Sequence, residues 1–437
     1  MANILVIGSG LAGAFTALVL KESGHNPTLY DQVNIVDKMQ HADGDASVVF
    51  FGDVGGSIAI YNNGLRVLER YGLIEEVYAA AHSSTPHMNF MKMDGSDPIR
   101  YTRKAENGLP MVQVLRTTLH NIMMRAAQKA GVRCFTGKRI CNVQEHDDSV
   151  TATFSDGTSA TGDFLFAADG IHSFTRHMLF PDAKAPVFYA RGYVGIFDRK
   201  EVDGEKIEFQ HPLGLYSDGL VGCAMYASHI GEERGGWTLV LLQDKPAGET
   251  DNKDWVPVTV ADLPREATKL ATVVESWGSH KSVVNTVKYA TRITPVTVWD
   301  LPDLASFYKG RVLLVGDAAH GTIPTLGQGL GQGLEDAGVL GQLLGEFDLK
   351  TEYKTIFELY EKVRLPHTRA AAKGARDIGG RLKAHNKVQA FVGRHIMRGI
   401  MWYRNTYGHF DAFVEYDYRL DVLQAVAEYK KQRSASV

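Results

Sequence analysis

The chain has 437 residues, of which 44% are hydrophobic and 22% charged, a composition typical of a globular protein and not of a disordered or fibrous one. Its net charge is −3 and it carries no long block of like charge, which disfavours nucleic-acid binding. No apolar stretch reaches the roughly 18 residues of a membrane span, so we expect no integral membrane association. Three cysteines are too few for a disulfide framework or a four-ligand zinc site, and they favour a cytoplasmic, reducing location.

The N-terminus predicts a strand, a turn and a helix. Residues 3–7 form a short apolar run, apolar positions then recur at helical spacing, and a second short strand follows at residues 28–30. Gly8, Gly10 and Gly13 occupy the turn, where glycines permit a sharp bend and a close approach of backbone to a pyrophosphate. Asp31 ends the second strand, where a carboxylate can accept hydrogen bonds from ribose hydroxyls. The alternative is a glycine turn that only packs a helix on a sheet.

A second motif lies in residues 163–176, where a buried strand leads into Asp169 and Gly170. In open α/β sheets ligands bind at such strand ends, so polar groups here are candidates for ligand binding. A surface turn with an Asx hydrogen bond explains these two residues about as well.

The third motif, residues 311–336, is the most informative. Its strand ends at Asp317, a carboxylate that could reach the sugar hydroxyls of a dinucleotide. Pro324, Gly327 and Gly329 follow, leaving open backbone at the start of a helix that we expect to begin near Gln328. The alternative is a flexible glycine loop.

Taken together and in this order, the three motifs resemble those of the class A flavoprotein monooxygenases, the group of p-hydroxybenzoate hydroxylase and salicylate hydroxylase. The resemblance implies FAD as cofactor and places the loop at Gly55 and Gly56 near the flavin. The residues implied to bind FAD are Gly8, Gly10, Leu11, Ala12, Gly13, Asp31, Gly56, Arg116, Asp169, Gly170, Asp317, Pro324, Gly327 and Gly329.

The expected architecture is α/β: a Rossmann-like FAD-binding domain with an inserted antiparallel-sheet substrate domain and a C-terminal helical region. The FAD-binding domain is predicted to be discontinuous, comprising residues 1–76, 100–182 and 285–350. The substrate-binding domain is predicted to comprise residues 77–99 and 183–284, where alternating and aromatic segments occur. The helical region is predicted to span residues 351–437, with the arginines of its basic pattern, Arg364 among them, on solvated helix faces.

The resemblance also implies an activity. NADPH or NADH would act as a transient reductant, and a flavin C4a-hydroperoxide would transfer one oxygen atom of O2 to an aromatic or polycyclic small molecule, hydroxylating or epoxidising it. The alternatives are an oxidase or dehydrogenase on the same fold without oxygen insertion, a non-catalytic flavin-holding protein, and a plain NAD-dependent dehydrogenase. A monomer or homodimer is expected.

The substrate side is less clearly marked. Salicylate-hydroxylase-like relatives usually carry an arginine shortly after a Gly-Tyr-Val segment, but here that segment is followed by Gly195, and the orientations of Arg191 and Arg199 are open. The candidates for hydrogen bonding or deprotonating a phenol are Tyr193, His211, Tyr216 and Tyr226, although each also suits a packed wall. The histidines show no metal-binding spacing, so no metal site is expected. We expect Met397 and Met401 to pack among the C-terminal helices.

Overall fold

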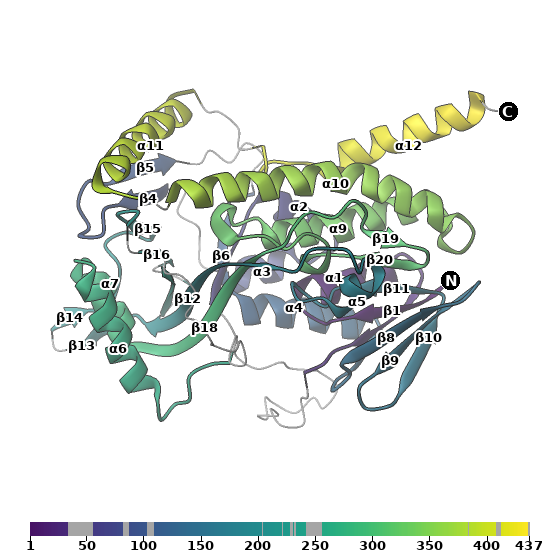
Figure 1. Ribbon diagram of the computed structural model, residues 1–437, viewed down its shortest axis with the longest axis horizontal. Coiled ribbons are helices and arrows are strands. Elements are labelled where there is room, and N and C mark those ends of the chain that lie inside the picture. Colours follow the sequence, from purple (N-terminus) through teal and green to yellow (C-terminus); the bar gives the residue numbers. More distant parts are fainter. Residues whose placement is uncertain are drawn as a thin grey trace.

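The computed structural model shows two packed bodies joined by two long strands (Figure 1). The structure describes residues 1–33, 56–81, 87–102, 109–202, 204–220, 222–227, 230, 233–241, 256–382, 384–407 and 412–435. One body is built on a mostly parallel sheet and the other on a mostly antiparallel sheet, so the predicted α/β architecture is confirmed. No helix in these described ranges is long and apolar enough to cross a membrane.

The first body is centred on a six-stranded sheet in the order β19-β20-β11-β1-β2-β7. Neighbouring strands run parallel, except that β19 runs antiparallel to β20. The strands are β1 (Asn3–Ile7), β2 (Asn26–Tyr30), β7 (Arg133–Phe135), β11 (Phe164–Ala167), β19 (Tyr308–Lys309) and β20 (Val312–Leu314). The central strands are almost wholly apolar because both faces of a parallel sheet are covered.

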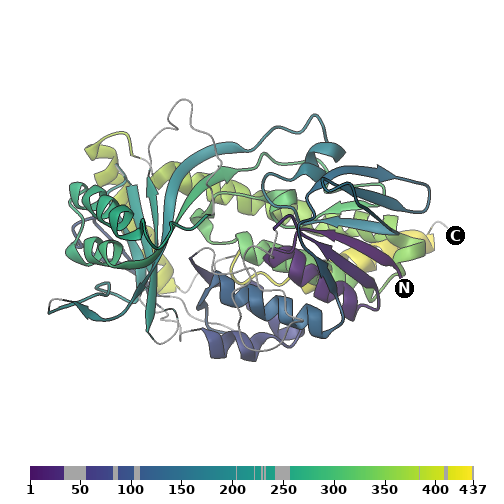
Figure 2. The ribbon, with the colours of Figure 1, turned by 90° about the horizontal axis from the view of Figure 1, so that it is seen from below.

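Helices cover one face of this sheet and a small meander covers the other (Figure 2). On the helical face, α1 (Leu11–Glu22) contacts α4 (Arg116–Lys129) and α9 (Gly329–Leu344). The meander is antiparallel and consists of β8 (Ile140–Glu145), β9 (Val150–Phe154) and β10 (Ser159–Gly162). The ring of Tyr30 on β2 stacks on Phe154 of β9 with their centroids 4.9 Å apart, which fixes the meander against the sheet.

The second body is a seven-stranded sheet in the order β18-β12-β17-β16-β15-β4-β5. Among the described strands of this sheet, β15 and β4 pair in parallel and the other neighbours pair antiparallel. The strands are β4 (His87–Met91), β5 (Ile99–Thr102), β12 (Val187–Asp198), β15 (Leu213–Ser217), β16 (Gly222–Ala227), β17 (Arg234–Leu241) and β18 (Ala290–Asp300). One face packs on α6 (Leu263–Ser276) and α7 (Lys281–Lys288), and a short ribbon of β13 (Glu201–Val202) and β14 (Glu205–Lys206) lies nearby. The opposite face is turned toward the first body.

The boundaries between the two bodies differ from the predicted ones. Strand β18 belongs to the second sheet, so the segment assigned to the FAD-binding domain from residue 285 begins too early, and β5 likewise lies in this sheet beyond residue 100. In contrast, α3 (Ile74–Ala80) buries Ile74 and Val77 in the core of the first body. The differences arise because strand pairing between distant segments cannot be read from local composition.

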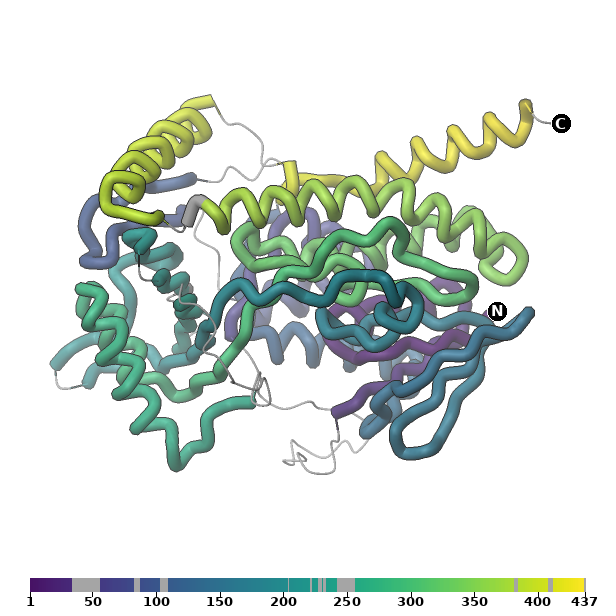
Figure 3. Tube along the Cα trace, viewed as in Figure 1, coloured from purple at the N-terminus to yellow at the C-terminus, as the bar shows by residue number. Residues whose placement is uncertain are grey.

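The C-terminal region is helical, as predicted, and its described residues form three helices. Helix α10 (Leu349–Leu382) runs along the first body and reaches toward the second (Figure 3), where the Tyr189 hydroxyl on β12 donates to the Gly379 carbonyl at 3.1 Å. Helix α11 (Lys387–Tyr407) then packs against β5, whereas α12 (Tyr418–Ala435) returns to contact α9 and α10. The region is therefore divided between the two bodies and does not form a separate unit.

Candidate cofactor and substrate site

A cavity of about 3130 Å³ lies between the two bodies. Its walls come from the carboxyl ends of the parallel strands, the free face of the seven-stranded sheet, the end of α10, and α11. Pockets for a single small molecule usually enclose roughly 300 to 1,000 Å³. This cavity is large enough for a dinucleotide together with a second molecule.

The turns of the first two predicted motifs touch one another at one edge of the cavity. Gly8 adopts φ +91°, and a Cβ placed on it would lie 2.4 Å from the Ala168 carbonyl oxygen, so only glycine fits. A Cβ on Gly13 would lie 1.9 Å from the Gly8 carbonyl oxygen, so α1 packs directly on its own turn. The third motif is adjacent, because the Val315 amide donates to the Ala167 carbonyl at 2.9 Å.

Gly10 behaves differently from these two glycines. A Cβ at this position would meet no protein atom within 4 Å and would extend into the cavity, which Gly10 lines together with Leu11 and Ala12. Helix α1 begins at Leu11, so its first amide groups and the positive end of its dipole lie at the same place. Open space in front of a helix N-terminus fits the close approach of a pyrophosphate.

Asp31 lines the cavity but is also bound to protein. Its Oδ2 accepts hydrogen bonds from the Ser9 amide at 2.7 Å and the Ser9 hydroxyl at 2.8 Å, and its Oδ1 accepts from the Val33 amide at 2.8 Å. The carboxylate therefore holds the glycine turn in place, a role that the sequence did not predict.

Asp169 and Gly170 combine a structural role with a position on the cavity wall. The Asp169 carboxylate accepts from the Ser173 hydroxyl and from the Thr175 amide, while Ser173 caps α5 (Phe174–Leu179). Gly170 has φ +81°, a conformation that favours glycine. The Asx-type hydrogen bonding considered as the alternative is therefore present, although both residues also line the cavity.

Asp317 and Arg116, two residues of opposite charge type, both line the cavity. Asp317 is the first residue of α8 (Asp317–His320), and its side chain is exposed to the cavity. The protein atoms around this carboxyl group reduce its hydration and so raise its pKa, although the cavity leaves its surface accessible, and the charges of His320 and Arg116 oppose the rise. Arg116 is the first residue of α4, and burial lowers its pKa while the charge of Asp317 raises it. Both groups can therefore bind polar parts of a ligand.

The glycine-rich loop of the third motif forms the wall next to Asp317. It contains the 3-10 helix η1 (Pro324–Leu326), then Gly327 in a left-handed conformation with φ +63°, and α9 begins at Gly329. A Cβ on Gly327 would lie 2.8 Å from the hydroxyl oxygen of Tyr61, which precedes α2 (Asn62–Arg70). Pro324, Gly327 and Gly329 all line the cavity.

An antiparallel pair of strands that are distant in the chain, β3 (Ser57–Ile60) and β6 (Val112–Leu115), also contributes to the cavity wall. Gly56 precedes β3, lines the cavity and accepts a hydrogen bond from the Arg116 amide through its carbonyl oxygen at 3.0 Å. Gly55 lies outside the described residues. Gly56, the described end of the predicted flavin loop, is thus adjacent to Arg116.

Tyr61 was missed by the sequence analysis. It lines the cavity. Its position at a strand-to-helix turn, directly after the predicted flavin loop, could have identified it as a cavity residue.

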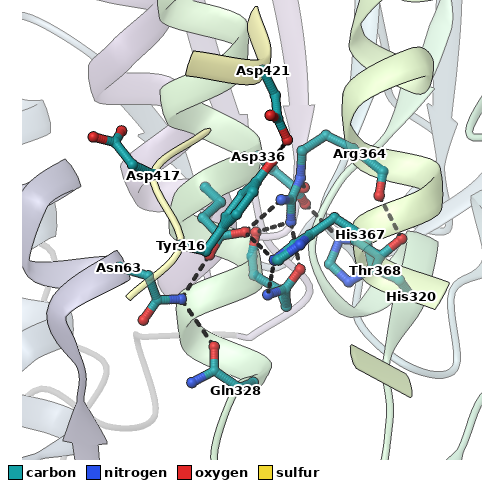
Figure 4. Close-up of polar contacts among 12 residues, drawn as sticks. Asn63, His320, Gln328, Asp336, Arg364, His367, Thr368, Tyr416, Asp417 and Asp421 are labelled. Carbon is teal, nitrogen blue, oxygen red and sulfur yellow. Dashed lines mark hydrogen bonds and ion pairs between the residues drawn. The ribbon is translucent and has the colours of Figure 1, made fainter. Parts of the chain in front are cut away.

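A buried ionic network lies behind the loop (Figure 4). Arg364 on α10 has no exposed surface, and its guanidinium donates to Asp336 Oδ1 at 2.7 Å and to the Glu335 carboxylate. Asp336 Oδ2 also accepts from the Gly316 amide at 2.8 Å and contacts His320 Nε2 at 2.7 Å. The expectation that Arg364 lies on a solvated face is therefore wrong, because two carboxylates on α9 compensate its charge inside the core.

The network extends to the cofactor loop and to α2. Glu335 Oε1 accepts from the Asn63 amide group at 2.6 Å, and the same Nδ2 atom donates to Gln328 Oε1 at 2.9 Å. The side chain of Gln328, the residue just before α9, is only 2% exposed. A chain of polar contacts thus connects Arg364 to the residue between Gly327 and Gly329.

The four substrate-side candidates do not converge on the cavity. Tyr193, His211 and Tyr216 are absent from its described lining, and only Tyr226 contacts it. Tyr226 is 2% exposed and stacks on Phe209 with their centroids 4.2 Å apart, in the core beneath α6 and α7. Burial raises the pKa of Tyr226 well above its ordinary value, which opposes deprotonation of its hydroxyl.

Other side chains also take positions that the sequence left open. Met397 and Met401 were expected to pack among the C-terminal helices, but from α11 they line the cavity. Arg191 and Arg199 are both absent from the described lining. Within the described ranges, no group of three His, Cys, Asp or Glu side chains is placed to hold a metal ion.

The geometry of the cavity agrees with comparisons to known proteins. The model of a family described as "FAD binding domain" matches residues 1–375. The chain belongs to this family. Hispidin-3-hydroxylase from Neonothopanus nambi is 29% identical over 387 residues, covering 83% of this chain and 85% of that protein. A 3-amino-4-hydroxybenzoate 2-monooxygenase from Streptomyces platensis is 29% identical over 390 residues, covering 86% and 87%.

Solved structures show the same fold. The crystal structure of Klebsiella pneumoniae HpxO complexed with FAD and uric acid aligns with a TM-score of 0.74 at 20% identity, covering 94% of this chain and 97% of that one. The resemblance to class A flavoprotein monooxygenases is therefore confirmed. The protein is a flavoprotein monooxygenase whose cofactor is FAD.

Proposed function

We propose that this monooxygenase uses NADPH or NADH and O2 to hydroxylate or epoxidise an aromatic or polycyclic small molecule. The observation that carries the proposal is the single cavity that connects Gly10, Asp317 and Gly327 with the free face of the seven-stranded sheet. The similar proteins named for hispidin, for 3-amino-4-hydroxybenzoate and for uric acid support a ring-shaped substrate.

We assign the FAD-binding roles from the positions of the residues along the cavity. The amide groups at the start of α1 would hold the pyrophosphate next to Gly10, where the open backbone permits close approach. Asp31 would accept from the ribose of the adenosine half, and Asp317 and Arg116 would bind the middle of the cofactor. The remaining contacts would come from Gly8, Leu11, Ala12, Gly13, Gly56, Asp169, Gly170, Pro324, Gly327 and Gly329.

When bound, FAD supplies the redox chemistry, accepting a hydride from NAD(P)H and activating O2. The protein has to orient the substrate against the flavin ring and keep water away from it. The loop from Pro324 to Gly329 forms one wall of that space, and the valine, leucine and methionine side chains of the seven-stranded sheet form the opposite wall. Apolar walls on this side exclude water and leave room for a flat ring.

The test is the aerobic consumption of NADPH and NADH by the purified protein with a panel of phenols, indoles and polycyclic aromatics, with peroxide and product mass followed together. We expect one compound to accelerate NAD(P)H oxidation, lower peroxide release and gain one oxygen atom. Peroxide equal to the NAD(P)H consumed with every compound, together with anaerobic reduction of the flavin by a substrate, would support the oxidase or dehydrogenase alternative. A cytoplasmic location and a monomeric or homodimeric state stay predictions.

A further inference from the structure

Helix α11 lies at one end of the molecule and carries an exposed apolar face (Figure 1, Figure 2). The structure describes all 21 residues of this helix, and none of them is buried. Eight of its large apolar or aromatic side chains are between 39% and 71% exposed. They are Val388, Phe391, Val392, Ile396, Ile400, Trp402, Tyr403 and Tyr407. We call these eight residues the α11 face.

The polar contacts of α11 lie on its other side. With 3.6 residues per turn, the α11 face follows one side of the helix from Val388 to Tyr407. The opposite side is turned toward the sheet, where Asn405 Oδ1 accepts from the Thr102 amide at 2.9 Å and Arg394 Nε donates to Asp97 Oδ2 at 2.5 Å. Helix α11 is therefore amphipathic, with polar groups toward the protein and apolar side chains toward the outside.

The apolar side chains form a patch and are not scattered. Single exposed apolar residues are normal on a protein surface, whereas a continuous patch marks a surface that another body covers. At the end of the α11 face the ring centroids of Tyr403 and Tyr407 are 4.9 Å apart, and those of Trp402 and Tyr407 are 6.4 Å apart. Because covering such side chains removes apolar area from water, the α11 face favours docking.

The charges around the α11 face indicate what covers it. Residues 87–102 and 387–407, which contain β4, β5 and α11, carry six lysines and arginines but two aspartates, whereas the whole chain has a net charge of −3. The Lys387 side chain is exposed, and Arg398 is partly exposed although it binds Asp97. This end is thus positive on a negative protein, so an anionic partner is attracted to it.

An anionic lipid surface fits these features better than a second copy of the chain. A symmetric pairing of two α11 faces would bring the same excess of positive charge to both sides of the interface, where like charges repel. Helices that lie in a lipid interface combine an apolar face with lysines and arginines and place Trp and Tyr near the head groups. Helix α11 has four lysines and arginines, no Asp or Glu, and an aromatic cluster near one end.

We propose that the protein docks reversibly on an anionic lipid bilayer through the α11 face, with the helix lying in the interface and not crossing it. This proposal does not depend on the proposed function, but it has a consequence for the cavity. Val392, Ile396 and Ile400 belong to the α11 face and also line the cavity, and Met397 and Met401 continue the apolar lining. A lipid-soluble substrate would therefore meet apolar side chains between the bilayer and the cavity.

The test is the binding of the FAD-loaded, full-length protein to lipid vesicles, measured by co-sedimentation. Vesicles of phosphatidylcholine are compared with vesicles in which about one third of the lipid is phosphatidylglycerol. We expect at least about tenfold stronger binding to the anionic vesicles at low salt, and weaker binding to them at high salt. Equal binding to both kinds of vesicle, or no binding to the anionic ones, would overturn the proposal.

Two double variants locate the contact. Trp402→Glu with Tyr403→Glu changes two residues of the α11 face that are absent from the described cavity lining, and we expect at least about tenfold weaker vesicle binding. The matched control is Leu420→Glu with Leu423→Glu, two similarly exposed residues of α12, which should bind as wild type does. The same affinity in both double variants would contradict the proposal. A dimer that becomes a monomer in the α11 variant, seen by light scattering without lipid, would assign the face to a second copy instead.

A measurement on Trp402 alone keeps the proposal testable if the glutamate variant does not fold. Lipids with brominated acyl chains quench the emission of a tryptophan that enters the bilayer. We expect quenching in wild type and the loss of most of it in Trp402→Phe, because phenylalanine preserves the apolar face. Equal quenching in both proteins would overturn the proposal. Flavin reduction by NADPH is recorded separately, since its absence contradicts the proposed function while vesicle binding tests docking alone.

Discussion

The two walls of the cavity are built on different principles. The wall assigned to the cofactor consists of glycine turns, helix N-termini and the charged pair Asp317 and Arg116, at the ends of parallel strands. The wall assigned to the substrate is the face of an antiparallel sheet and carries rows of valine, leucine and methionine. The first wall recognises a dinucleotide through its backbone and charges, whereas the second offers shape and apolar contact.

This difference explains what each wall tolerates. Gly8 has φ +91°, and a Cβ on Gly13 would lie 1.9 Å from a carbonyl oxygen, so no other residue fits at these two positions of the cofactor wall. The side chains of the sheet face can be exchanged for others of similar size, so the same frame can accept many substrates. Four predictions test whether the walls differ in this way.

The largest effect is expected behind the cofactor wall, at Arg364. The variant Arg364→Met leaves the carboxylates of Glu335 and Asp336 buried without their common cation. We expect a loss of about 3–5 kcal/mol in the free energy of unfolding, the usual consequence of breaking a buried ion pair on one side. Denaturant unfolding of the FAD-loaded protein measures it.

Lys373 on the same helix provides the matched control. Its side chain is 77% exposed and pairs with Asp377 one turn away, so Lys373→Met should change the free energy of unfolding by less than about 0.5 kcal/mol. If Arg364→Met were no more destabilising than this control, the network would not hold the cofactor wall together.

An intermediate effect is expected in the substrate sheet, at Gly195. A Cβ at this position would lie 2.1 Å from the ring of Trp237, which is 2% exposed in the core of the second body. We expect Gly195→Ala to cost about 1–3 kcal/mol through overpacking. The control Gly380→Ala places a Cβ in open space within α10 and should stabilise by up to about 1 kcal/mol. Equal melting temperatures for the two variants would contradict the packing described for the sheet.

The smallest effect concerns pH. Burial raises the pKa of both Glu335 and Asp336. The charges of His320 and Arg364 outweigh this effect at Asp336, and the charge of Arg364 and the hydrogen bond with His367 outweigh it at Glu335, so both pKa values lie below normal. Groups with a depressed folded-state pKa stabilise the protein above the ordinary carboxyl pKa of about 4 and lose that contribution as the pH falls. The stability difference between wild type and Arg364→Met should therefore shrink by about 1 kcal/mol or more between pH 7 and pH 3. A difference independent of pH would show that packing, and not charge, accounts for it.

Most residues that the sequence assigned to the cofactor line one cavity, and they could be grouped from the sequence because their signals are local. Gly8, Gly10 and Gly13 lie within six residues of one another, and each of the other motifs lies within one strand and the turn after it. Arg364 was misplaced because its partners are 28 and 29 positions away, and a basic residue has the same helical spacing whether its face is buried or solvated. The set of side chains on the free face of the substrate sheet could not be predicted either, because it depends on the register of the strands β18, β12, β17, β16, β15 and β4. The alternating direction of side chains along a strand was the only signal for the orientation of Tyr193 and Tyr216. It does not show which face of the sheet is turned toward the cavity.

The most direct test of the cofactor assignment is the affinity of FAD for Gly10→Val. In the protein alone this side chain would meet no atom within 4 Å at its Cβ, so the fold should accept it and the melting temperature without FAD should stay close to that of wild type. The space that it fills is the one assigned to the pyrophosphate, so we predict FAD binding at least about tenfold weaker, roughly 1.4 kcal/mol, in a titration of the flavin-free protein. FAD binding equal to wild type in a folded Gly10→Val protein would contradict the account.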